Sequence, residues 1–185
     1  TDNNEAALFT TAELFLSASG KPIGAVCRLQ YTEANTNVSN VAFGLADVMG
    51  GANTLLDDGG GPAASFYGAH MYKTDGSTVW KCASSAGTVA SAGTTTTSTQ
   101  TAGGASFQKL KILIEPISGA FNSSKVSFFL DGMPLTDSRN LPITHTVGHG
   151  AAATGEMNLG VYAKVGAANN SWVVQVDYMQ AWQER

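Results

Sequence analysis

The sequence predicts an all-β protein, folded as a single antiparallel β-sandwich or jelly roll. Two patterns carry this prediction: apolar side chains recur at every second position in several short segments, and glycine-rich turns separate those segments. No segment combines helix-capping residues with apolar residues at helical spacing. A chain of 185 residues, 43% of them apolar, can bury one sizeable core. We therefore expect one domain that spans residues 1–185.

Nine segments carry the strand pattern. They are Glu13–Leu16, Ile23–Tyr31, Asn40–Leu45, Phe66–Lys73, Thr78–Ala83, Lys109–Glu115, Lys125–Asp131, Glu156–Lys164 and Trp172–Trp182. Asp75-Gly76 and Asp131-Gly132 are typical of tight turns that follow a strand. Continuous alternation through the last segment puts Trp172 and Trp182 on one apolar face, which favours a core position for both.

Two other segments are less regular. Ala46–Leu56 is the best candidate for a short helix or turn, although Gly50-Gly51 interrupts it. Residues 82–108 carry no charge and include the run Thr94–Thr97. That stretch is either a surface loop or a strand-forming arm that adds to the sheet of a neighbouring subunit.

Charge excludes several classes of protein. The chain has a net charge of −4 and only 10 basic residues, which argues against nucleic acid as a partner. No apolar run reaches the roughly 18 residues of a membrane helix. Charged residues make up 13% of the chain, against about 25% in a typical soluble domain. Because interface cores are poor in charge, we expect neighbouring subunits to cover part of the surface, as in a homo-oligomer.

Cysteines, glycosylation sequons and the first residue are only weakly informative. Cys27 and Cys82 either form one disulfide or remain two buried thiols. The sequons at Asn37, Asn122 and Asn169 matter only in a eukaryotic secretory setting. Because the chain begins at Thr1, we expect a processed or trimmed N-terminus.

No group of residues predicts catalysis, a metal site or a cofactor. A glycosidase needs two carboxylates on one face, whereas Glu115 and Glu156 are both expected at strand ends. His145 and His149 share a face if the chain is extended, but a third metal ligand is missing. Asp57-Asp58 is better suited to a turn than to calcium. Neither a nucleophile elbow nor a phosphate-binding loop is present.

Aromatic side chains provide the remaining binding candidates. Trp80, which is next to Lys81 in a predicted hairpin, and Tyr67 are the two rings expected to be exposed and to stack on a sugar.

Several strands resemble those of a known family. Lys125–Gly132, the Gly160-Val161-Tyr162 strand and Val174–Trp182 follow the order seen in concanavalin A-like lectin/glucanase (laminin G-like) jelly rolls. Val41–Leu45 and Tyr67–Lys73 resemble the early strands of variants found in tailed-bacteriophage virion proteins. The resemblance covers about residues 10–185, but it includes neither the glucanase carboxylates nor the metal-binding residues of lectins.

This resemblance implies a scaffold without a catalytic site. The first functional expectation is a non-enzymatic capsid decoration or cement protein, on the outer shell of a virion and in contact with the major capsid protein or other virion subunits. An alternative is a carbohydrate-binding, lectin-like module, which would be extracellular if it is not on a virion. A third is a glycoside hydrolase that has diverged. Fold alone does not decide between them.

Overall fold

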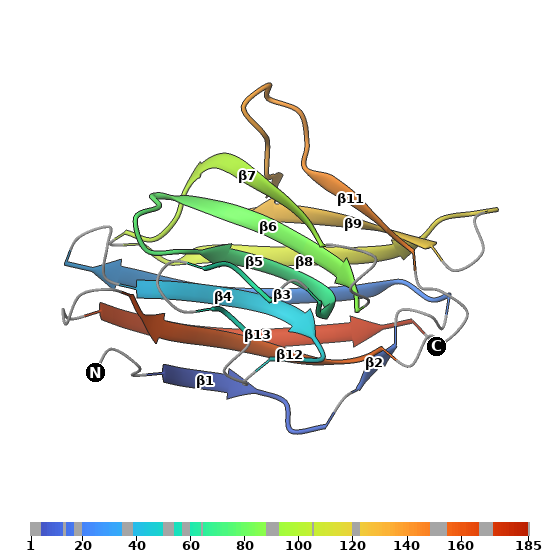
Figure 1. The fold of residues 1–185 in the computed structure, drawn as a ribbon, viewed down its shortest axis with the longest axis horizontal. Coiled ribbons are helices and arrows are strands. Elements are labelled where there is room, and N and C mark those ends of the chain that lie inside the picture. Colours follow the sequence, from blue (N-terminus) through green and yellow to red (C-terminus); the bar gives the residue numbers. More distant parts are fainter. Residues whose placement is uncertain are drawn as a thin grey trace.

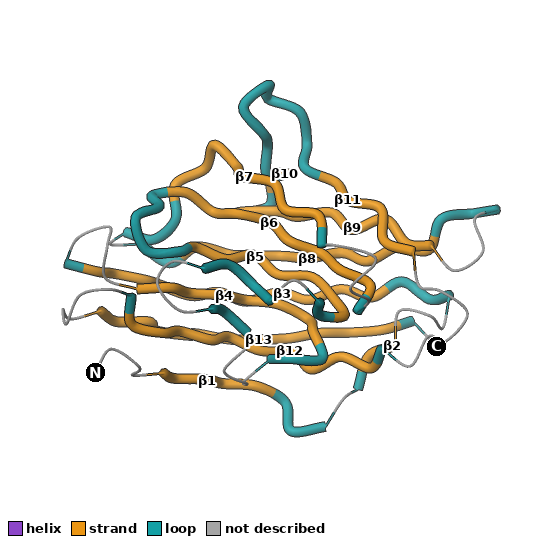
Figure 2. Tube along the Cα trace, viewed as in Figure 1, coloured by secondary structure: helices purple, strands orange, loops and turns teal. Residues whose placement is uncertain are grey.

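The chain folds into strands joined by loops and turns. The computed structural model describes residues 5–12, 14–16, 20–34, 39–49, 54–56, 60–63, 65–87, 93–104, 106–119, 123–148, 155–166 and 172–184. These residues contain no helix (Figure 2). The strands are β1 (Glu5–Phe9), β2 (Phe15–Leu16), β3 (Ile23–Glu33), β4 (Ser39–Ala46), β5 (Tyr67–Lys73), β6 (Val79–Ala86), β7 (Thr94–Thr101), β8 (Gln108–Pro116), β9 (Ser123–Leu130), β10 (Met133–Pro134), β11 (Thr144–Gly148), β12 (Glu156–Val165) and β13 (Trp172–Gln183).

The strands form two antiparallel sheets that lie face to face (Figure 1). One sheet has seven strands in the order β1-β12-β4-β5-β6-β7, with β2 also paired to β12. The other has six strands in the order β10-β9-β8-β3-β13, with β11 also paired to β9. This arrangement confirms the predicted antiparallel sandwich.

The main core lies between the sheets because alternate residues of their strands face inward. Its fully buried side chains include Leu29 of β3 and Phe43 of β4, and Trp80 of β6 lies in the same layer. Lys73 is also fully buried, and its ammonium lies 2.6 Å from the carboxylate of Glu33. A buried ion pair therefore links β5 to β3.

A second apolar cluster covers the outer face of the seven-stranded sheet. Tyr72 and Tyr162 project from that face and are buried by Met49, Leu55 and Phe66 from the segment between β4 and β5. This face therefore presents packed side chains instead of an open sheet surface over the described residues.

All nine predicted strands have a counterpart in the structure, although the first is shortened to β2 and Glu13 lies outside the described residues. Four strands were not among the nine: β1, β7, β10 and β11. The turns at Asp75-Gly76 and Asp131-Gly132 are confirmed, and Asp131 itself has a positive φ of 51°. Ala46–Leu56 is the segment expected to form a short helix or turn. The turn is confirmed at residues 47–49, and the helix is wrong for residues 46–49 and 54–56, which contain only the end of a strand, this turn and a bend.

The uncharged stretch 82–108 is a strand of this chain's own sheet over Thr94–Thr101. This strand, β7, pairs with β6, and its amide at Thr99 donates to the Thr136 carbonyl at 3.0 Å. The expectation of a surface loop is therefore wrong for this part. The strand propensity of the threonines is satisfied within the chain, so it does not require a neighbouring subunit.

Both cysteine thiols are free and buried, Cys27 in β3 and Cys82 in β6. Burial raises the pKa of the Cys27 thiol to about 12, so this thiol stays neutral. The described residues include no helix that is long and apolar enough to cross a membrane.

Candidate functional site

The two aromatic residues expected to stack on a sugar are buried. Trp80 is fully buried in the core, and its indole N–H donates to Oε1 of Gln108 at 3.1 Å. Tyr67 is 6% exposed and packs close to Gly155. The expectation that these rings are exposed is wrong, because alternation identifies residues that share a face but does not say which face is inside.

The candidate glycosidase carboxylates lie in different sheets. Glu115 is in β8 of the six-stranded sheet and forms an exposed ion pair with Lys125 at 3.3 Å. Glu156 starts β12 of the seven-stranded sheet and is exposed. These two carboxylates therefore do not face one another across a cleft, as hydrolysis of a glycosidic bond would require.

His145 connects the two sheets. Its Nδ1 lies 2.8 Å from the hydroxyl of Ser84, and its Nε2 lies 3.1 Å from the hydroxyl of Thr96. Burial lowers the pKa of the imidazole to about 4, so the ring is neutral at pH 7. Because both nitrogens have protein partners, the ring serves to join β11 to β6 and β7.

Several predicted features fall outside the described residues. They are His149, Asp57-Asp58 and the sequons at Asn37, Asn122 and Asn169. Among the described residues, no three His, Cys, Asp or Glu side chains are grouped closely enough to hold a metal ion.

Strand β13 contains an irregularity that changes which residues face solvent. Val176 is paired with Leu29 and Tyr178 with Arg28, so Asp177 is an extra residue in a β-bulge. Before the bulge, Trp172 packs against the core. After it, the alternation is reversed, and Tyr178 and Trp182 are exposed on the outer face of the six-stranded sheet. The expected core position is therefore wrong for Trp182.

Trp182 lies flat against the sheet. It pairs with Gly24 of β3, and a Cβ built on Gly24 would collide with the indole ring. One face of the ring therefore packs on the backbone of the neighbouring strand, while 40% of the residue remains exposed. Glycine permits this close approach because it has no side chain.

Basic side chains from neighbouring strands lie on the same face, one beside this ring and one beside the bulge. The ammonium of Lys111 in β8 is 6.0 Å from the centre of the Trp182 ring and 5.4 Å from the centre of Phe129 in β9. Arg28 in β3 stacks over Phe107 at 4.5 Å and pairs with Asp177 at 2.5 Å.

Tyr178 and Gln180 complete the group. Both precede Trp182 on the same face of β13, and both are exposed. We call the surface formed by Arg28, Lys111, Phe129, Tyr178, Gln180 and Trp182 the outer platform. It combines two exposed aromatic rings with cationic and amide groups that can bind hydroxyl or acidic oxygens.

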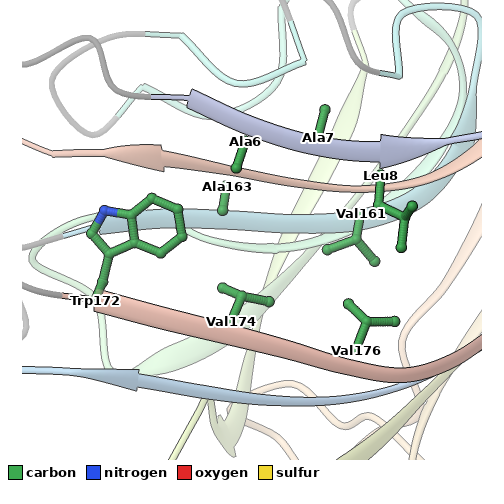
Figure 3. A pocket seen from close by; sticks show the side chains of 8 residues that line it. All are labelled: Ala6, Ala7, Leu8, Val161, Ala163, Trp172, Val174 and Val176. Atoms are coloured by element: carbon green, nitrogen blue, oxygen red, sulfur yellow. The ribbon is translucent and has the colours of Figure 1, made fainter.

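A separate groove opens between β1 and β12 on one side and β13 on the other. Figure 3 shows Trp172, Val174 and Val176 of β13 pointing toward the side chains of β1 and β12. The groove has a volume of about 310 Å³ and is otherwise lined by alanine, valine and leucine. Because it lacks side-chain acceptors and has only the indole N–H as a donor, it is less suited to a sugar than the outer platform.

Sequence comparisons do not identify a family: no family model matches the chain, and no curated protein sequence matches it. Solved structures do share the fold. The carbohydrate recognition domain of Emp46p has a TM-score of 0.58 and 14% identity, over 98% of this chain and 78% of that domain. An endo-1,3-β-glucanase from Streptomyces sioyaensis has a TM-score of 0.57 and 16% identity, over 95% of this chain and 68% of the enzyme. Peanut lectin has a TM-score of 0.52 and 14% identity, over 99% of this chain and 80% of the lectin.

These similarities establish the fold as that of lectin and glucanase jelly rolls. The concanavalin A-like resemblance seen in the sequence is thereby confirmed. None of these three structures is that of a virion protein.

The outer platform was not predicted from the sequence, because the alternation of apolar and polar residues does not reveal an extra residue in a β-bulge. One signal was available. In the segment from Trp172 to Gln183, two residues with polar side-chain groups, Asp177 and Tyr178, follow one another. Unbroken alternation would bury Tyr178 on the same face as Val176. A bulge at Asp177 resolves this conflict.

Proposed function

We propose that this protein is a non-enzymatic carbohydrate-binding module whose ligand stacks on the outer platform. The observation that supports this proposal best is the indole of Trp182, which has one face on Gly24 while 40% of the residue is exposed. The face of an aromatic ring carries negative partial charge. It therefore attracts the weakly positive C–H groups on the face of a pyranose ring.

The geometry favours an oligosaccharide over a single sugar. Tyr178 and Trp182 are four residues apart on one strand face, which separates them by about 13 Å. Gln180 lies between them and offers both a donor and an acceptor to sugar hydroxyls. The lectin-like fold of the structural neighbours also supports this function.

A glycan array followed by calorimetry tests the proposal. We expect Trp182→Ala to weaken binding of the best glycan by about tenfold or more, because an aromatic hot spot contributes more than about 1 kcal/mol. Leu141→Ala is the matched control, since Leu141 is exposed but lies outside the outer platform. Equal affinity of the Trp182 variant and the wild type would contradict the proposed site.

The hydrolase alternative has a direct assay. If the chain cleaved a polysaccharide, Glu115→Gln or Glu156→Gln should abolish the release of reducing ends. Because these carboxylates lie in different sheets, we expect no cleavage above background in the wild type or in either variant. Turnover by the wild type that either substitution removes would replace the binding proposal with a hydrolase.

The capsid decoration function is the weaker proposal, because the outer platform and the fold neighbours favour glycan binding instead. The capsid partner, the homo-oligomer and the virion location remain predictions, as do the absence of nucleic acid and membrane as partners. Cryo-microscopy of particles that carry this chain would test the capsid partner.

A further inference from the structure

A single lysine is placed beside the stacking ring of the outer platform. The ammonium of Lys111 lies between the rings of Trp182 and Phe129, within the range of cation–π attraction. It forms no ion pair with a carboxylate of the described residues. A positive charge is thus held next to the indole without a protein anion to neutralise it.

Two other cationic side chains on this face are paired with carboxylates. Arg28 pairs with Asp177 at 2.5 Å, and Lys125 pairs with Glu115 at 3.3 Å. The side chain of Lys109 adds a further exposed cation two residues before Lys111. The carboxylate of Asp131 accepts from the backbone N–H of Lys109 at 2.7 Å. Arg28, Lys109, Lys111 and Lys125 still outnumber the three nearby carboxylates, so this face is locally positive on a chain whose net charge is −4.

We propose that the glycan bound at the outer platform is acidic, and that its carboxylate or sulfate group pairs with Lys111 while its ring stacks on Trp182. This inference rests on the proposed function and specifies its ligand class. A charge-assisted hydrogen bond from an ammonium to an anionic oxygen is roughly twice as strong as a neutral one. An acidic sugar thus gains a contact that a neutral sugar of the same shape lacks.

Lys111 has an alternative role, in which it only holds Trp182 and Phe129 in place. Two substitutions separate these roles. Lys111→Arg retains the charge and the cation–π contacts, whereas Lys111→Gln retains much of the length but removes the charge. If the charge binds the ligand, the glutamine variant should lose acidic glycans selectively and keep neutral ones.

Calorimetry with three probes provides the test: oligogalacturonate, which carries carboxylates; dextran sulfate, which carries sulfates; and a neutral cello-oligosaccharide. We expect the better acidic probe to bind about tenfold more tightly than the neutral probe at about 0.1 M salt, and the difference to shrink at about 1 M, where the Debye length falls from about 10 Å to about 3 Å. The acidic probe that binds more tightly shows whether the outer platform prefers a carboxylate or a sulfate.

The variants complete the experiment. Lys111→Gln should remove the preference for the acidic probe, Lys111→Arg should restore it, and Lys125→Gln, which removes an equal charge from an existing ion pair, should change it less than about twofold. Equal binding of acidic and neutral probes, or an unchanged preference in Lys111→Gln, would overturn the acidic ligand and leave the proposed function in place. No binding of any glycan would overturn the proposed function itself.

Discussion

His145 and His70 make the stability of the fold depend on pH. Burial lowers the pKa of His145 to about 4 and that of His70 to about 3, from an unfolded value near 6.5. His70 is stacked on Phe66 at 4.5 Å between ring centres. Between pH 6.5 and the folded pKa, the unfolded chain binds more protons than the folded chain. The free energy of unfolding is therefore not reduced by these histidines above about pH 6.5, and it decreases as the pH falls toward 4.

We expect the free energy of unfolding to decrease below pH 6.5 by about 1.4 kcal/mol per pH unit for each of these histidines. In a His145→Gln variant, the loss between about pH 6.5 and pH 4.5 should be smaller by about 2 kcal/mol. Urea unfolding at both pH values gives this difference, and an NMR titration of His145 should show no protonation above about pH 5. Protonation of His145 near pH 6.5 would contradict the link between burial and stability.

The buried ion pair of Lys73 and Glu33 predicts a large effect of one substitution. Lys73 also donates to the Tyr31 hydroxyl at 3.1 Å, so its removal leaves several buried groups without their donor. Lys73→Met should lower the free energy of unfolding by about 3–5 kcal/mol. Lys125→Met removes an exposed pair and is the control, with an expected change of at most about 1 kcal/mol. Similar losses for both variants in urea unfolding would contradict the buried character of Lys73.

At the scale of the element, β13 and β3 together position Trp182 in the outer platform. The bulge at Asp177 turns Trp182 outward, and Gly24 gives its ring a backbone surface to rest on. Gly24→Ala should lift the indole from the sheet and weaken glycan binding by about tenfold, because a Cβ would occupy the position of the ring.

Gly148→Ala in β11 is the matched control, since a Cβ there meets no atom within 4 Å. Calorimetry measures the glycan affinity of both variants, and thermal unfolding confirms that they fold. Together they separate a local effect on the outer platform from a loss of stability of the whole protein. If Gly24→Ala bound the glycan with the affinity of the wild type, packing of the Trp182 ring on β3 would not be required for binding.

The strands illustrate what the sequence could predict. Segments such as Lys109–Glu115 alternate apolar and polar residues, and this period together with the glycine-rich turns located nine strands. Edge strands β1 and β11 were missed because their pattern is short and weak. The orientation of Trp80 and Trp182 was not predictable from alternation, because the inner face depends on the partner sheet and on a bulge at Asp177.

At the scale of the molecule, the two outer faces of the sandwich differ, and we propose ligand binding only on the six-stranded sheet. Tyr72 and Tyr162 are covered by the segment that contains Met49, Leu55 and Phe66, whereas the six-stranded sheet presents exposed rings. The low charge content of the chain predicted covered surfaces. The uncharged strand β7 pairs with β6 of the same chain through its backbone, while most of its residues are exposed.

The outer platform should bind its ligand without a metal ion. Its contacts come from indole, phenol, amide and cationic groups, and no metal-binding cluster occurs in the described part of the chain. We expect dialysis against a chelator to change glycan affinity less than about twofold, since calcium requires several oxygen ligands. Loss of binding on chelation and its recovery with calcium would contradict this expectation.

The three tryptophans occupy three different environments, so one spectrum tests the central claim. Trp80 is in the core, Trp172 lines the groove and Trp182 lies on the outer platform. Indole N–H resonances of ¹⁵N-labelled protein, assigned by single Trp→Phe variants, should be followed during titration with the glycan selected by the array. We predict that the Trp182 resonance shifts most and that the Trp80 resonance stays in place. A dominant shift of Trp172 would move the site to the groove and contradict glycan binding on the outer platform.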